Sequence, residues 1–174
     1  MTMTASRVFS DTDKMPTLSP EKEKNEVKNE SGITVCFVCS GNTCRSPMAQ
    51  AYLNYKGAGK GIRALSAGIS TQGLSPISSA AIEALDKAGV PCTPANNYRA
   101  HLSSPTSAEL FERCDRIIGM TSRHTMLLLM NYPEFAAKIS SFPSDIPDPF
   151  GQDTEIYCEI LDMIKEGILS EFGV

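Results

Sequence analysis

Residues 33 to 53 read ITVCFVCSGNTCRSPMAQAYL, and this stretch joins an apolar segment, a polar loop and the start of a helical pattern. The β-branched and aromatic residues from Ile33 to Val38 predict a strand. The segment from Pro47 to Leu53 predicts the first turns of a helix, with proline near the start, where a helix tolerates it. A loop between a strand end and a helix N-terminus exposes unpaired backbone N–H groups, and the helix dipole adds partial positive charge. The stretch therefore predicts an anion-binding loop that suits a tetrahedral phosphate.

Cys39 and Arg45 give this loop its chemistry. Cys39 stands at the mouth of the loop, where N–H dipoles and the charge of Arg45 are expected to favour its thiolate. Arg45 supplies a planar fork that can hold two phosphoryl oxygens, which a lysine does less well. A thiolate beside a bound phosphoryl group is a nucleophile, so the pair suggests phosphoryl transfer through a cysteinyl-phosphate.

Length and composition indicate one ordinary domain. The chain has 174 residues, of which 41% are hydrophobic, and this is enough for a substantial core. No apolar run approaches the roughly 18 residues of a membrane span, and the N-terminus lacks a secretory signal pattern, so we expect a cytoplasmic location without membrane contact. The net charge of −4 is spread without a basic block, which argues against nucleic acid as a partner.

The cysteine pattern is typical of reduced thiols rather than of a disulfide framework. Six cysteines are scattered through core-like segments: Cys36, Cys39, Cys44, Cys92, Cys114 and Cys158. Cys36 and Cys39 are three residues apart on an extended strand, so their side chains are expected on opposite faces, which disfavours a redox motif. No cysteine pair has histidines at zinc-site spacing, and we expect neither a metal nor a cofactor.

The remaining chain alternates strands and helices. Residues 1–31 carry a mixed-charge run and few apolar residues, so we predict a disordered tail before a domain at 32–174. Strands are predicted at 62–68, 115–120 and 138–142, and helices at 77–88, 106–113, 122–131 and 153–171. We expect Ser122 to cap its helix, and residues 126–130 to lie in the core. The alternation predicts an α/β fold, a parallel sheet covered by helices on both faces, with ligands beyond the C-terminal strand ends.

A cysteinyl-phosphate route needs an acid for the leaving group and a base for water, and one carboxyl group can serve both steps. Asp148, followed by Pro149 and the aromatic Phe150, is the preferred candidate over Asp145. The alternative is that Asp148 and Pro149 only mark a turn, and the local pattern leaves the two interpretations about equal.

Three motifs together carry a family resemblance. Residues Cys39 to Pro47, the run Ser66-Ala67-Gly68 and the run Asp148-Pro149-Phe150 occur in the order found in the low-molecular-weight protein tyrosine phosphatase superfamily, which the chain resembles from about Ile33 to its end. The resemblance implies a four-stranded parallel sheet in a Rossmann-like three-layer sandwich. It implies Cys39 as nucleophile, Arg45 as phosphate ligand and Asp148 as acid and base. It also implies a phosphate-binding loop and supporting hydrogen bonds from these residues: Ser40, Gly41, Asn42, Thr43, Cys44, Ser46, Ser66 and His101.

Thr43 and Phe150 bear on the substrate. The bacterial protein-arginine phosphatases resemble this chain in having threonine where typical tyrosine phosphatases have isoleucine. A hydroxyl there can bond near a phosphoguanidinium group, where an isoleucine methyl would crowd it. Gly151 follows Phe150, whereas the tyrosine phosphatases usually carry a second aromatic residue. We therefore expect a phosphorylated protein substrate, phosphoarginine ahead of phosphotyrosine, with inorganic phosphate or a similar oxyanion as product or inhibitor.

Two other functions remain as alternatives. Arsenate reductases share the fold and loop, but resemblance to them would require a redox cysteine pair after the third strand, where this chain has residues 119–122 without cysteine. A non-enzymatic phosphate-binding module would be favoured if Cys39, Arg45 or Asp148 were missing. The resemblance also implies that Cys44 can form a reversible disulfide with Cys39 that protects the nucleophile, while a small core-facing role is the alternative.

Overall fold

The computed structural model describes residues 32–174, so the tail predicted at 1–31 lies outside the described residues. The strands are β1 (Ile33–Cys39), β2 (Ile62–Gly68), β3 (Arg116–Gly119) and β4 (Ile139–Ser141). The helices are α1 (Arg45–Lys56), α2 (Ser79–Lys87), α3 (Ala108–Glu112), α4 (Ser122–Asn131) and α5 (Thr154–Phe172), with short 3-10 helices η1 (Tyr98–Ala100) and η2 (Pro133–Lys138). Every strand and α-helix predicted from the sequence is present, and the two 3-10 helices were not predicted.

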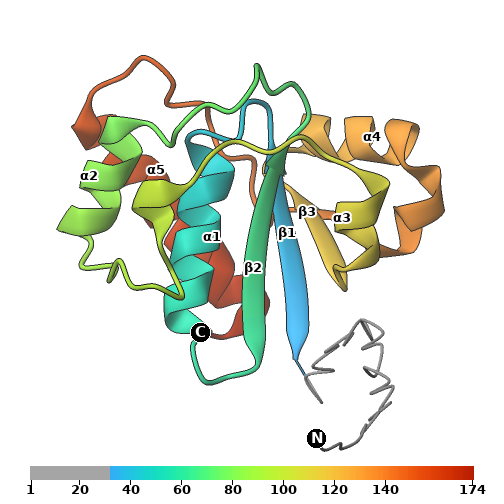
Figure 1. Cartoon of the computed structure of the whole chain (residues 1–174), viewed down its shortest axis with the longest axis horizontal. Helices are drawn as coiled ribbons and strands as arrows, with labels where there is room; N and C mark the ends of the chain where they lie inside the picture. The colour runs from blue at the N-terminus through green and yellow to red at the C-terminus, as the bar shows by residue number, and fades with distance from the viewer. Residues whose placement is uncertain (1–31) are drawn as a thin grey trace, which may run out of the picture.

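The four strands form one parallel sheet in the order β2-β1-β3-β4. The register places Cys39 opposite Gly68, Val38 opposite Gly119 and Gly119 opposite Ser141. All four C-terminal strand ends therefore meet at one edge of the sheet, the upper edge in Figure 1. The loop after β1 lies at this edge, as predicted for an α/β fold.

Helices cover both faces of the sheet, and two hydrophobic clusters fill the layers between (Figure 1). Val35, Phe37 and Cys39 of β1 lie in the cluster shared with α1, α2 and α5. Cys36 and Val38 lie in the second cluster, on the side of α3 and α4. The alternation along β1 confirms that Cys36 and Cys39 point to opposite faces. It also explains why β1, buried on both sides, is a continuous apolar run.

Helix α4 corrects two predictions. Its N-cap is Thr121, whose hydroxyl accepts a hydrogen bond from the backbone N–H of His124, so the prediction of Ser122 as cap is wrong. Ser122 instead bonds Asp145 through its N–H and its hydroxyl. The prediction that residues 126–130 lie in the core holds only for Leu128, while Met130, for example, is 71% exposed. A helix on an outer layer buries one stripe, and an apolar run without helical spacing extends beyond that stripe.

Helix α5 lies on the same side of the sheet as α1 and α2 and packs against both. Asp153 caps it by accepting from the N–H of Ile156, and Gly173 ends it in a left-handed conformation. Gly167, buried in α5, faces Phe142 at the end of β4. Within residues 32–174 no helix is long and apolar enough to cross a membrane.

Candidate active site

The loop from Cys39 to Cys44 crosses the upper edge of the sheet and leads directly into α1. Cys44 is the N-cap of α1, and its side chain makes no capping hydrogen bond. The first-turn N–H groups of α1 are therefore available to a ligand in the loop, and the helix dipole favours an anion. Gly68 permits the close approach of β2, because a Cβ there would lie 2.6 Å from the Ser40 carbonyl oxygen.

Asn42 holds the loop in shape. Its φ of 56° lies in the left-handed region, which asparagine tolerates better than most residues. Its side-chain amide donates to the hydroxyls of Ser46 and Ser66, both at 2.9 Å, and its side-chain oxygen accepts from the Ser104 N–H at 2.9 Å. Its backbone carbonyl accepts from His101 Nε2 at 3.0 Å. Asn42 thus ties the loop to α1, β2 and the segment after η1.

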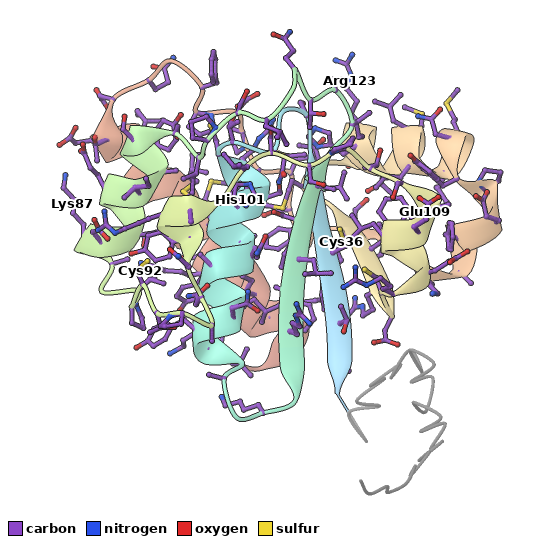
Figure 2. All side chains as sticks on the ribbon, viewed as in Figure 1. Cys36, Lys87, Cys92, His101, Glu109 and Arg123 are labelled. Carbon is purple, nitrogen blue, oxygen red and sulfur yellow. The ribbon has the colours of Figure 1, made fainter. Side chains whose placement is uncertain are left out.

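His101 must donate in this contact, because a carbonyl oxygen only accepts. Burial lowers the pKa of His101 from its ordinary value of 6.5, although the bond to Asn42 acts in the opposite direction. The ring is therefore neutral at neutral pH and donates from Nε2. Figure 2 shows His101 near the loop end of α1, on the segment that crosses in front of that helix.

The Cys39 thiol is buried and has two donors beside it. Its Sγ lies 3.0 Å from the Ser46 hydroxyl and 3.3 Å from the backbone N–H of Asn42. The Ser46 oxygen already accepts from the Asn42 amide, so its own proton can point to the sulfur. Hydrogen bonds of this kind stabilise a thiolate. The residues around Cys39 thus offer hydrogen bonds to its sulfur from within the loop and α1.

Arg45 and Asp148 face each other at the mouth of the loop. One guanidinium nitrogen lies 2.8 Å from Asp148 Oδ2, and the other donates to the Ile146 carbonyl at 3.2 Å. Arg45 is buried, whereas the Asp148 side chain is 52% exposed. The guanidinium is held in place beside Cys39, and the carboxyl group can reach a bound substrate. Asp145 does not enter this arrangement, because its carboxylate binds Ser122.

A cavity of about 650 Å³ opens over the loop. Thr43 and Asp148 lie on its wall, and Phe150, 73% exposed, stands at its rim. The residues around it come from four segments: Cys39, Ser40, Gly41, Asn42, Thr43, Cys44, Arg45, Ser70, Gln72, Ser75, Pro76, Ile77, Ser78, Ser79, Asp148 and Phe150. Such a volume accommodates a phosphorylated side chain together with adjacent backbone.

The structure brings together every site residue predicted from the sequence. Ser46, Ser66 and His101 contact the loop through Asn42. Cys44 also borders the cavity, with its Sγ 3.2 Å from the Tyr157 hydroxyl of α5. Among residues 32–174 no group of three His, Cys, Asp or Glu side chains is arranged to hold a metal ion.

His124 and Tyr157 were not predicted as site residues. His124 lies in the first turn of α4, and its Nε2 is 2.9 Å from the Ser40 hydroxyl. Tyr157 lies in α5 behind Cys44. Both reach the loop through tertiary packing, and their local sequence contains no motif that would have identified them.

Comparison with known proteins identifies the architecture. A family model described as low molecular weight phosphotyrosine protein phosphatase matches residues 34–170. The chain belongs to this family. It is therefore a phosphatase, a hydrolase with a four-stranded α/β fold, and the loop after β1 is the one that the sequence predicts to bind phosphate.

Several relatives of this chain are named arginine phosphatases. A protein-arginine-phosphatase of Bacillus subtilis (strain 168) is 30% identical over 143 residues, covering 77% of this chain and 91% of that protein. A protein-arginine-phosphatase of Geobacillus stearothermophilus is 35% identical over 138 residues, covering 75% and 88%. A solved YwlE arginine phosphatase, a mutant with a phosphorylated active-site serine, superposes with a TM-score of 0.70 at 28% identity, covering 80% of this chain and 97% of that one.

The chain is also similar to a protein with a different named activity. An arsenate reductase of Staphylococcus aureus (strain N315) is 27% identical over 135 residues, covering 78% of this chain and 92% of that protein. Family membership alone therefore does not identify the substrate of this phosphatase, and the residues around the loop have to be considered individually.

Proposed function

We propose that this chain hydrolyses phosphorylated protein side chains through a cysteinyl-phosphate intermediate. The observation that carries the proposal is the Arg45 to Asp148 ion pair at 2.8 Å beside the Cys39 thiol. It combines a phosphate ligand and a carboxyl group at one cavity with a buried sulfur that has two hydrogen-bond donors. The solved relative with a phosphorylated active-site serine supports a nucleophile at the Cys39 position.

The first step forms a sulfur–phosphorus bond. Cys39 Sγ attacks phosphorus, the bond to the leaving nitrogen or oxygen breaks, and Asp148 donates a proton to that leaving atom. Loop N–H groups from Ser40 to Arg45 and the Arg45 guanidinium bind the phosphoryl oxygens as charge develops. In the second step the Asp148 carboxylate takes a proton from water, the water oxygen attacks phosphorus, and inorganic phosphate leaves as Cys39 returns to the thiolate. Ser46, Ser66 and His101 hold the loop during both steps.

For the substrate we favour phosphoarginine, with phosphotyrosine a close second. Thr43 lines the cavity with a hydroxyl that an isoleucine would replace by a methyl group. Phe150 borders the cavity with its aromatic ring. The next residue is Gly151, at a φ of 82°, so no second aromatic side chain follows it. The two arginine phosphatase relatives support the same preference.

Kinetics on matched peptides test the proposal. Cys39→Ser is expected to reduce turnover of both phosphoarginine and phosphotyrosine peptides to background, and Asp148→Asn to lower kcat about 100-fold. Thr43→Ile is expected to shift the ratio of phosphoarginine to phosphotyrosine turnover about tenfold towards phosphotyrosine. An unchanged ratio contradicts the substrate assignment, while activity in Cys39→Ser contradicts the mechanism.

Arsenate reduction is the second candidate, favoured by one named relative. The segment after β3 does not support it, because residues 119–122 contain no cysteine for a redox pair. Met120 is buried there, Thr121 caps α4, and Ser122 bonds Asp145. Arsenate-dependent oxidation of thioredoxin by the purified chain would reverse the ranking. A non-enzymatic phosphate-binding role is disfavoured by the assembled Cys39, Arg45 and Asp148.

We also propose that Cys44 is the redox partner of Cys39. Both sulfurs border the same cavity and are free thiols in the structure. Peroxide would oxidise the Cys39 thiolate to a sulfenic acid, and attack by Cys44 sulfur would form the disulfide and release water. A reducing compartment such as the cytoplasm would keep the nucleophile active, and we propose that location, with residues 32–174 as the catalytic unit.

A further inference from the structure

His124 is a buried histidine that the steps above do not use. It is 5% exposed and lies in the first turn of α4, directly after the C-terminal end of β3. Its Nε2 lies 2.9 Å from the Ser40 hydroxyl, and its Nδ1 lies 2.8 Å from the Thr121 hydroxyl. The ring therefore bridges the cap of α4 to the first residue of the phosphate-binding loop.

The contacts of Thr121 indicate which ring nitrogen carries the proton. The Thr121 oxygen accepts the backbone N–H of His124 at 3.2 Å, and His124 Nδ1 is the acceptor within reach of its own hydroxyl proton. If Thr121 donates to Nδ1, the proton of the neutral ring is on Nε2. Nε2 then donates to the Ser40 oxygen. In this arrangement the Thr121 hydroxyl proton and the His124 Nε2 proton both have acceptors, and the Ser40 hydroxyl proton remains for a ligand.

Burial, with help from nearby positive charges, keeps the ring neutral. Burial and the Arg45 charge lower the pKa of His124 from 6.5 to about 4, with Arg123 acting in the same direction. Asp145 and Asp148 act in the opposite direction. Figure 2 shows Arg123 at the upper edge of the molecule beside the start of α4. At neutral pH the ring therefore has one donor and one acceptor nitrogen.

Ser40 lies at the meeting point of two cavities. It borders the cavity over Cys39 and a second one of about 480 Å³ that includes His124, Arg45 and Asp148. With the proton on His124 Nε2, the Ser40 oxygen accepts from that nitrogen, and it also faces an Arg45 nitrogen at 3.5 Å. A hydroxyl oxygen has two acceptor positions and one proton, so these contacts leave the proton for an acceptor in the loop.

We propose that the Ser40 hydroxyl donates a hydrogen bond to the phosphoryl group, and that His124 is the positioning residue that fixes this hydroxyl as a donor. The inference rests on the proposed function and adds one ligand to the backbone N–H groups of the loop. The hydrogen bonds from Thr121 to His124 and from His124 to Ser40 leave the Ser40 hydroxyl proton directed at the bound anion.

A double-mutant cycle tests the coupling. Ser40→Ala and His124→Phe are each expected to lower kcat/KM for an aryl phosphate about tenfold, as expected for loss of a hydrogen bond to a charged group. The double variant is expected to lose no more, because His124 acts through Ser40. His124→Gln, which retains a donor, is expected to recover most of the activity. Ser122→Ala, in the same turn, is the control and is expected to match the wild type.

Two further measurements do not depend on turnover. The dissociation constant for inorganic phosphate, measured by calorimetry, is expected to rise in Ser40→Ala and in His124→Phe by similar factors. Nitrogen-15 NMR of the wild type is expected to show His124 protonated on Nε2. The inference would be overturned if the losses of the two single variants multiplied in the double variant. It would also be overturned by a His124 ring protonated on Nδ1, or by unchanged phosphate binding in Ser40→Ala. If Cys39→Ser is inactive and Ser40→Ala is fully active, only this inference is rejected. If Cys39→Ser is active, the proposed function is rejected.

Discussion

The two thiols of the phosphate-binding loop have different neighbours. Cys39 accepts from the N–H of Asn42 and lies 3.0 Å from the Ser46 hydroxyl. Cys44 faces the Tyr157 hydroxyl at 3.2 Å. Burial is the largest cause that raises the pKa of Tyr157 to about 12, so the phenol keeps its proton and can donate it to the Cys44 sulfur. The proposed nucleophile thus has its hydrogen-bond partners within the loop and α1, whereas the second thiol contacts α5 beside the same cavity.

At this scale we predict that Cys44 protects the nucleophile. Peroxide is expected to inactivate the wild type reversibly, with activity restored by dithiothreitol, because the disulfide stops oxidation of Cys39 at a recoverable state. Cys44→Ser is expected to lose activity permanently under the same treatment. Cys92→Ser, at an exposed thiol outside the loop, is the control and should recover like the wild type. Equal recovery of Cys44→Ser would remove the proposed role.

At the scale of elements, α5 depends on a glycine at its contact with β4. A Cβ at Gly167 would lie 2.1 Å from Cε1 of the Phe142 ring. Phe142 is itself buried and meets Phe37 of β1 edge to face, with ring centroids 6.1 Å apart. Because the ring is enclosed by β1 and α5, it cannot move aside without disturbing both layers.

We therefore predict that Gly167→Ala destabilises the protein. Overpacking costs about 1 to 3 kcal/mol, and alanine returns roughly 1 kcal/mol of helix propensity, so the net loss is expected near 1 kcal/mol. Urea unfolding followed by circular dichroism measures it. Ser170→Ala, at an exposed position of α5, is the control and is expected to be neutral or slightly stabilising. A Gly167→Ala variant as stable as the control would show that Phe142 can repack.

At the scale of the whole molecule, one edge of the sheet collects the site. The loop after β1, the segment after β2, the start of α4 after β3 and the loop before α5 all meet there. The hydrophobic clusters beneath them use residues from Val35 onward. The contacts that build the site and the core described above are thus made within residues 32–174.

From the mixed-charge composition of residues 1–31 we predict that they are dispensable for catalysis. A chain starting at Gly32 is expected to keep kcat/KM for an aryl phosphate within about twofold of the full chain. Thermal unfolding of the shortened chain checks that the domain remains folded. A tenfold loss of kcat/KM with an unchanged melting temperature would assign the first 31 residues a part in the site.

Sequence patterns predicted the positions of the strands and helices more accurately than the exposure of individual side chains. The strand from Ile33 and the alternating helices followed from local apolar spacing, and the boundaries differ from the structure by one or two residues at most ends. The exposed Met126 and Met130 were wrongly expected in the core, because a purely apolar run does not show which side of a helix meets the sheet. The N-cap of α4 was predicted at Ser122, one residue after the observed Thr121, because serine and threonine are both common N-cap residues.

The sequence by itself determined the chemistry of the phosphate-binding loop. A thiol, glycine, asparagine and arginine within a few residues, between a strand and a helix start, specify a local backbone and its charges without distant contacts. Only the tertiary structure showed that His124 and Tyr157 also contact that loop and that Asp148 forms an ion pair with Arg45. The segments after β3 and β4 reach the loop because the parallel register of β1 with β3 and of β3 with β4 brings them to one edge. Side-chain contacts between residues far apart in sequence depend on packing, and no local pattern encodes that distance.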